Sequence, residues 1–212
     1  MGARGIMPET IYLKEIASGT AFVLTFLIFL PYIISIKKTQ TVPHFFSWLI
    51  WSFGTFIVFF AQLSDGAGMG AWPIGFSACI TCYVAYLSYR IRSKVEITAI
   101  DFAFFGLAIL AMPAWFFASD PLWAVVLLTL ADLLGFGPTL RKAYSHPYDE
   151  NMGFFALAGA RNALVIVALE NYSWTTVLFP AAVGVACAFV TIAIYLRRSK
   201  VSRANTKIGE DD

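Results

Sequence analysis

Long apolar runs, broken by short charged gaps, are the feature that most restricts how this chain can fold. The 212 residues contain seven such runs of about 18 to 24 residues, and a helix of about 20 apolar residues spans the hydrocarbon layer of a bilayer. Only 13% of the residues are charged and 59% are apolar, whereas about a quarter of the residues of soluble domains are charged. The chain is therefore predicted to be an all-α membrane protein, and a soluble globular enzyme is excluded.

We predict seven transmembrane helices, separated by charged residues, glycines and prolines. They cover residues 16–36, 45–63, 71–89, 97–117, 122–140, 152–169 and 174–196. Lys and Arg occur in the gaps after the first, third and fifth helices and in the C-terminal tail, but not in the gaps after the second, fourth and sixth. Because cytoplasmic loops are enriched in Lys and Arg, we predict a multi-pass cell-membrane protein with its N-terminus outside and its C-terminus in the cytoplasm. The first run lacks a signal-peptide cleavage pattern, so we expect it to be retained.

The second half of the sequence matches the first at a nearly constant offset. The helix endings at residues 89–94 (YRIRSK) and 195–200 (YLRRSK) match at an offset of 106. The alternative is that all cytoplasmic helix ends look alike, being Tyr followed by Arg and Lys. Prolines match at an offset of 107, which pairs Pro31 with Pro138 and Pro73 with Pro180.

An offset that spans four helices relates two repeats of the same orientation. We therefore predict two parallel triple-helix bundles, with helices one to three in residues 1–94 and helices five to seven in residues 121–200. The fourth helix, in residues 95–120, would link them. Residues 201–212 are polar, and we predict a disordered cytoplasmic tail.

This layout resembles the SWEET and PQ-loop superfamily of seven-helix membrane proteins. The similarity rests on the 3+1+3 arrangement, on the proline near the inside end of the first helix of each bundle, on the basic segment that follows it, and on Trp48 and Trp51 in the second helix. The Pro-Gln dipeptide that names the superfamily reads Pro-Tyr at residues 31–32 and Pro-Thr at residues 138–139. The resemblance implies two triple-helix bundles and, by analogy, transport of a small molecule.

Two charged residues lie deepest in the predicted helices, and charge inside a membrane is costly and usually functional. Asp132 precedes Arg141 by nine residues and Arg161 follows Met152 by nine, so both lie about 13 Å from the inside boundary at 1.5 Å per residue. Equal depth on consecutive helices allows an ion pair, with Asn162 completing the hydrogen bonds. Two interpretations stay open: a structural bridge, or a site in which either residue binds a charged group or Asp132 takes up a proton.

Aromatic residues and prolines supply the remaining candidates. Trp48 and Trp51 lie three residues apart and share a helix face, which favours stacking against a ring-bearing substrate; contact with lipid or with other helices is the alternative. Four prolines each remove a backbone donor and permit a kink, and we predict that they act as hinges for alternating access: Pro31, Pro73, Pro138 and Pro180. The alternative is that prolines near helix ends are tolerated.

The leading prediction is an integral membrane transporter, either a facilitator or proton-coupled, that moves a small polar metabolite through a cavity between the two bundles. Its candidate substrate-binding residues are Asp132, Arg161, Asn162, Trp48 and Trp51. The alternative is a non-transporting seven-helix receptor or sorting module that binds an acidic ligand through Arg161. An enzyme is least favoured, because the sequence contains no nucleophile–base or metal-ligand constellation. The expected partners are the lipid bilayer and a small-molecule substrate; we expect no cofactor, no metal and, at a net charge of +2, no nucleic acid, and a homo-oligomer is left open.

Overall fold

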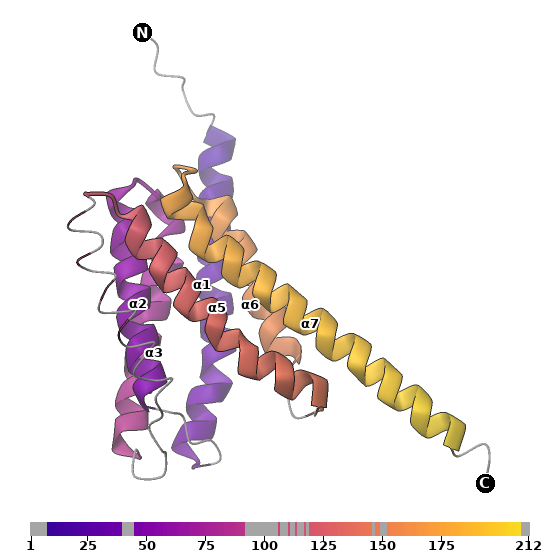
Figure 1. Ribbon diagram of the computed structural model, residues 1–212. Helices are drawn as coiled ribbons and strands as arrows, with labels where there is room; N and C mark the ends of the chain where they lie inside the picture. The colour runs from indigo at the N-terminus through magenta and orange to yellow at the C-terminus, as the bar shows by residue number, and fades with distance from the viewer. Residues whose placement is uncertain are drawn as a thin grey trace.

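The computed structural model of the chain is built from α-helices (Figure 1). It describes residues 8–39, 45–91, 106, 110, 113, 117, 119–145, 147–148 and 152–208. The described elements are α1 (Pro8–Lys37), α2 (Phe45–Ser64), a 3-10 turn η1 (Gly68–Gly70), α3 (Trp72–Arg90), α5 (Leu122–Ser145), α6 (Met152–Ala168) and α7 (Trp174–Ile208). The all-helical fold predicted from the apolar runs is therefore confirmed for this part of the chain.

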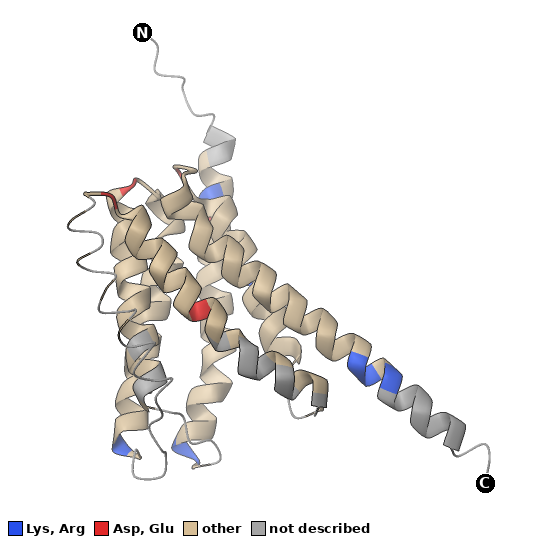
Figure 2. Ribbon diagram, in the orientation of Figure 1, with Lys and Arg blue, Asp and Glu red and all other residues tan. Residues whose placement is uncertain are grey.

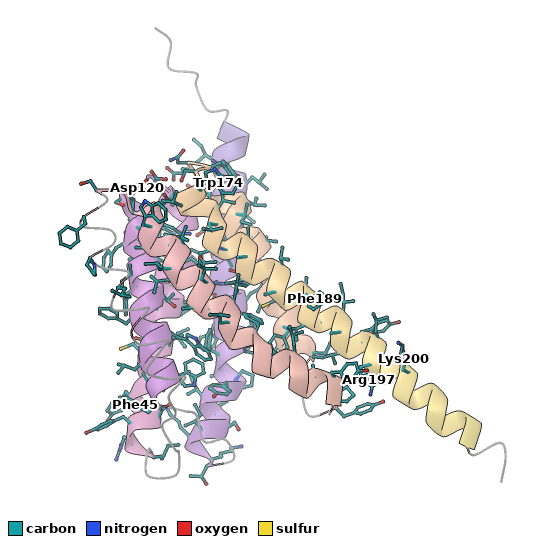
Figure 3. All side chains as sticks on the ribbon, viewed as in Figure 1. Phe45, Asp120, Trp174, Phe189, Arg197 and Lys200 are labelled. Carbon is teal, nitrogen blue, oxygen red and sulfur yellow. The ribbon has the colours of Figure 1, made fainter. Side chains whose placement is uncertain are left out.

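Three of the described helical segments are long and apolar enough to cross a membrane, namely Ile11–Lys37, Gly68–Arg90 and Trp174–Lys200. The other helices contain shorter apolar stretches, which are Trp51–Ser64, Leu122–Leu134 and Met152–Ala168. Large apolar side chains also cover the outer faces of α1 and α7, where Val23 is 59% and Val185 is 70% exposed. Phe189 of α7 points away from the neighbouring helices (Figure 3). An exposed apolar surface of this extent is typical of a protein that contacts lipid, so these features indicate a membrane protein.

The observed helix boundaries agree with the predicted ones where the helix ends at the same place as its apolar run. Each end of α2, α3 and α6 lies within one residue of its predicted position. By contrast, α1 begins at Pro8, before the predicted residue 16, and α5 and α7 continue to Ser145 and Ile208. The predicted disordered tail is therefore wrong for residues 201–208, which extend α7. An apolar run marks the part of a helix that suits lipid, and a helix continues past it where polar residues also have adequate helix propensity.

The predicted fourth helix, residues 97–117, lies outside the described residues except at positions 106, 110, 113 and 117. Six α-helices are described along the rest of the chain. A seventh helix and its role as a linker stay predictions.

Two helices occupy central positions in the packing. α3 packs against both α1 and α2, and α7 packs against both α5 and α6. In addition, α1 packs against α6, and α2 packs against α5. α5 and α6 therefore lie on either side of α7, although they follow each other in the chain.

Charged residues distinguish the two ends of the helix assembly (Figure 2). Lys37 and Arg90 end α1 and α3, and Arg197 lies near the end of the apolar part of α7, Trp174–Lys200; we call this the basic end. Asp65 follows α2 and Glu170 follows α6, and we call the side of the assembly where they lie the acidic end. Figure 2 also shows an acidic position midway along α5, far from both ends.

The main hydrophobic core fills the acidic half of the assembly. All six described α-helices contribute to it, and its fully buried members include Val58, Ile74, Val125, Val165 and Leu169. A smaller cluster, Ala143, Val190 and Ile194, joins α5 to α7 in the basic half. The helices are therefore packed together most completely near the acidic end.

Hydrogen bonds also join the two chain segments that turn at the acidic end. The backbone N–H of Glu170 donates to Ala67 O at 3.0 Å, and Asn171 Nδ2 donates to Asp65 O at 2.7 Å. Ser173 Oγ donates to the carboxylate of Asp65. We call these three contacts the acidic-end lock, because they connect the segment after α2 with the segment after α6.

Candidate functional site

A cavity of about 300 Å³ lies on the basic side of the core, and residues from all six described α-helices line it. Its volume is at the lower limit of the range that small-molecule sites occupy. The structure brings all five candidate residues into its wall, namely Trp48, Trp51, Asp132, Arg161 and Asn162. Their role in binding a substrate stays a prediction.

Equivalent positions of the two halves of the chain line this cavity together. Ten of its lining residues form five pairs that lie 107 residues apart, which are Thr25 and Asp132, Phe29 and Phe136, Trp48 and Phe155, Trp51 and Ala158, and Thr55 and Asn162. This is the offset that pairs the prolines. The cavity therefore lies where matching parts of α1 and α5, and of α2 and α6, come together.

Arg161 connects α6 to the first half of the chain. Its side chain is 7% exposed and makes three hydrogen bonds. Nε donates to Thr25 Oγ1 of α1 at 3.1 Å, Nη2 donates to Pro73 O of α3 at 2.7 Å, and Nη1 donates to Asn162 Oδ1 at 3.3 Å. Asn162 Nδ2 in turn donates to Ala158 O at 2.8 Å. The guanidinium is therefore held by three helices and faces the cavity with its position fixed.

The ion pair predicted between Asp132 and Arg161 does not form, since no described acidic and basic groups come within 4.0 Å of each other at this site. The prediction assumed that consecutive helices are neighbours, but α7 packs between α5 and α6. Arg161 instead reaches α1 and α3. Among the described residues, no donor forms a hydrogen bond with Asp132, which lines the cavity separately.

Aromatic rings form much of the cavity wall. Trp48 contacts Trp51 edge-on, with ring centroids 5.2 Å apart, and lies 6.2 Å from Phe29. In α6, the ring centroids of Phe154 and Phe155 lie 5.3 Å apart, with the ring planes at 83°. The predicted shared face of Trp48 and Trp51 is therefore turned toward the cavity.

Pro180 lies inside α7 and leaves the Thr176 carbonyl without its helical donor, because proline has no N–H. Gln62 Nε2 of α2 donates to that carbonyl at 2.8 Å. Gln62 is fully buried, and its Oε1 has no hydrogen-bond partner in the described part of the chain. A side chain of one half thus replaces a backbone donor that is missing in the other.

The remaining predicted hinges have different settings. Pro73 lies in the first turn of α3, where a proline costs no helical hydrogen bond, so it does not interrupt that helix. The Met69 carbonyl, four residues before it, accepts a hydrogen bond from Ser18 Oγ of α1 at 2.8 Å. Pro31 lies inside α1, and Pro138 lies within the bounds of α5. A hinge role for these prolines stays a prediction.

The sequence interpretation missed several polar and aromatic residues of the cavity. Thr25 and Thr55 are ordinary helix residues by type, and Phe136 is one of 20 phenylalanines. The offset of 107 could have found them, because it pairs each with a candidate or with another wall residue. In the described part of the chain, no group of three or more His, Cys, Asp or Glu side chains is placed to hold a metal ion.

Comparison with known proteins gives no relative for this chain: no protein-family model, curated protein or solved structure matches it.

Proposed function

We propose that the chain is a seven-helix integral membrane transporter, in which two triple-helix bundles enclose a central site for a small polar metabolite. The observation that carries this proposal is the cavity. Its wall residues come from all six described α-helices, and ten of them form five pairs at an offset of 107. Transporters built from parallel repeats bind their substrates near the bilayer midplane, at the interface of the repeats. The resemblance to SWEET and PQ-loop proteins supports the same function by analogy.

Helix packing supports the arrangement in two bundles. The contact of α1 with α3 matches that of α5 with α7, and the contact of α2 with α3 matches that of α6 with α7. Between the proposed bundles, the contact of α1 with α6 matches that of α5 with α2. Exchanging the first three helices with the last three leaves these three pairs of contacts unchanged, as a two-fold axis along the membrane normal requires; the smaller contact of α2 with α7 has no counterpart of similar extent between α6 and α3.

The difference between the two ends supports alternating access. The acidic-end lock and the core connect both halves at one end. At the basic end, the described contacts stay within one half: Lys37 lies over the ring of Tyr83 at 5.5 Å, and Arg197 Nε donates to Tyr144 O at 2.8 Å. Figure 3 shows Phe45 and Arg197 well apart at this end. We assign the structure to a state in which the cavity opens toward the basic end.

The charge distribution supports an orientation in the cell membrane. Because Lys and Arg favour the cytoplasmic side, the basic end would face the cytoplasm and the N-terminus would lie outside. Trp72, Trp123 and Trp174 lie in the first turns of their helices at the acidic end, and each is at least half exposed. Exposed tryptophans at this position are typical of the membrane–water interface. The state described here would then be inward-open.

Uptake by proteoliposomes that contain the full chain tests the proposal. We expect saturable uptake of at least one metabolite from a labelled panel of small polar compounds. Asp132→Asn should lower that uptake at least about ten-fold, because it removes a charge from the cavity wall. The matched control is Asp120→Asn, since Asp120 caps α5 through the Leu122 N–H at 2.8 Å and Asn caps equally well. Saturable binding without flux would indicate the receptor alternative and contradict transport.

A further inference from the structure

We infer that the cavity binds a ring-bearing zwitterion, a small molecule with one cationic group, one anionic group and a flat ring. This inference rests on the proposed function, because it names the substrate class of the same site. Three features of the wall carry it: a carboxylate with no partner among the described residues, a guanidinium with two N–H donors not used by them, and aromatic rings from both halves of the chain.

Asp132 supplies the negative side of the site. Its side chain lines the cavity from α5, and no described residue forms a hydrogen bond or an ion pair with it. A carboxylate in a largely apolar cavity is costly unless a donor or a cation neutralises it. A cationic group of the ligand would satisfy Asp132, whereas an uncharged hydroxyl would leave the charge uncompensated.

Arg161 supplies the positive side. A guanidinium has five N–H donors, and the hydrogen bonds to Thr25, Asn162 and Pro73 use three of them. Two N–H groups therefore have no acceptor among the described residues, and the acceptors that Arg161 does use are uncharged. An anionic group of the ligand would accept from these donors and neutralise the guanidinium.

The separation of the two charges favours one ligand that carries both. Asp132 and Arg161 are more than 4.0 Å apart in the described structure, since they form no ion pair, yet they line the same cavity of about 300 Å³. The two charges sum to zero, so a ligand with no net charge completes the site. A singly charged ligand would leave either Asp132 or Arg161 without a counter-charge.

The asymmetry between the two halves explains why Asp132 has no partner in the part of the chain that the structure describes. Asp132 and Thr25 lie 107 residues apart, as do Arg161 and Gly54. Across α1 and α6, Thr25 is bonded to Arg161. Across α5 and α2, the position that matches Arg161 is Gly54, which has no side chain, and a Cβ there would lie 3.1 Å from Leu128 Cδ2. Among the described residues, the carboxylate therefore has no donor at the place where the arginine has no match.

The rings of the wall account for the flat part of the ligand. Phe29 and Trp48 line the cavity from the first half of the chain, and the residues that match them, Phe136 and Phe155, line it from the second half. Aromatic pairs stack or meet edge-on over centroid distances of about 4.5 to 7 Å. A flat ring bound among these side chains would contact both halves of the protein at once.

Binding to the purified full chain in lipid nanodiscs tests the inference. The probes are two zwitterions, phenylalanine and 4-(aminomethyl)benzoate. Each is compared with its amine-only analogue, phenethylamine or benzylamine, and with its carboxylate-only analogue, 3-phenylpropanoate or 4-methylbenzoate. We expect at least one zwitterion to bind at least about ten-fold more tightly than both of its analogues, because each analogue leaves one buried charge unpaired.

The variant Asp132→Asn should abolish the preference for the zwitterion over the carboxylate-only analogue, and Asp120→Asn should retain it. If neither zwitterion exceeds both of its analogues, or if Asp132→Asn keeps the preference, the inference is wrong. Saturable uptake of an uncharged or singly charged metabolite, without zwitterion binding, would overturn the substrate class and leave the proposed transport intact. Zwitterion binding without flux would support the site and contradict transport.

Discussion

Arg161 and Asp132 illustrate how differently two intramembrane charges can be accommodated in one cavity. The guanidinium has three hydrogen-bonding partners on three helices, whereas Asp132 has none among the described residues. Arg161 therefore has a structural role as well as a place in the cavity wall. Asp132 has no hydrogen bond to a described residue that its substitution could break, so the substitution should affect ligand binding much more than stability.

The planar geometry of Arg161 can be tested by its replacement with lysine. Arg161→Lys keeps the positive charge, but a single ammonium group cannot reach Thr25 Oγ1, Asn162 Oδ1 and Pro73 O at once. We expect the free energy of unfolding in mixed micelles to fall by about 2 kcal/mol or more, because at least one buried charged hydrogen bond is lost. Arg90→Lys is the control, since Arg90 is exposed at the end of α3, and should change stability by less than about 0.5 kcal/mol. Equal effects of the two substitutions would contradict this role.

At the scale of helices, Gln62 and Pro180 form a unit across two elements. Pro180 removes the donor of the Thr176 carbonyl, and Gln62 of α2 replaces it. This contact ties the interior of α7, where the helical hydrogen bonding is interrupted, to the opposite half of the chain. If α7 bends at Pro180, either the hydrogen bond from Gln62 breaks or α2 moves together with α7.

A double-mutant cycle measures that connection. Gln62→Met removes the donor, and Pro180→Ala restores an N–H that can donate to Thr176 O. We expect Gln62→Met to lower the free energy of unfolding by about 1 kcal/mol more in the wild-type background than in Pro180→Ala. Pro31 lies inside α1 and serves as the control. Combining Gln62→Met with Pro31→Ala should give a coupling energy near zero. The interpretation fails if the two cycles give the same coupling energy.

Helix boundaries and helix neighbours differ in how far the sequence predicts them. The ends of α2, α3 and α6 were predictable because charged residues or glycines interrupt the apolar run where the helix ends. The contacts between helices were not predictable, since chain order does not determine packing. The expected Asp132–Arg161 pair failed for that reason. Part of the cavity wall was predictable in principle, because charge inside a predicted span and the offset of 107 indicate Asp132, Arg161 and the residues that pair across the two halves, but neither signal indicates Ser77 or Thr81 of α3.

For the whole molecule, the close packing at the acidic end is what the proposed transport cycle would have to undo. A Cβ at Gly70, in the turn before α3, would lie 2.8 Å from Leu169 N and 2.9 Å from Leu169 Cα. Backbone atoms cannot yield as a flexible side chain can. The two halves are therefore in contact at Gly70 with no room for a larger residue.

Gly70→Ala should consequently separate the halves at the acidic end. We expect a loss of about 1 to 3 kcal/mol in the stability of the closed acidic end and a shift toward a state open on that side. A cysteine placed at Ser77 in the cavity wall, in a chain without Cys79, Cys82 and Cys187, reports this shift. An impermeant thiol reagent should label it from the basic side in the parent chain and increasingly from the acidic side in Gly70→Ala.

The control is Gly19→Ala in α1, where a Cβ meets nothing within 4 Å. Alanine has a higher helix propensity than glycine, so this variant should be at least as stable as the parent and should keep its labelling pattern. Unchanged labelling in both variants would show that the contact at Gly70 does not restrain the acidic end.

The unequal pairs around the cavity have a consequence for how a ligand can sit in it. Five pairs of wall positions match between the two halves, but the matched residues are not the same. Thr25 is matched by Asp132, and Gly54 is matched by Arg161. A site with true two-fold symmetry would accept a molecule equally well in either of two poses related by a half-turn. With both charges contributed by one half, only one pose places cation against carboxylate and anion against guanidinium. In this proposal, the substrate travels through the membrane with a defined head and tail.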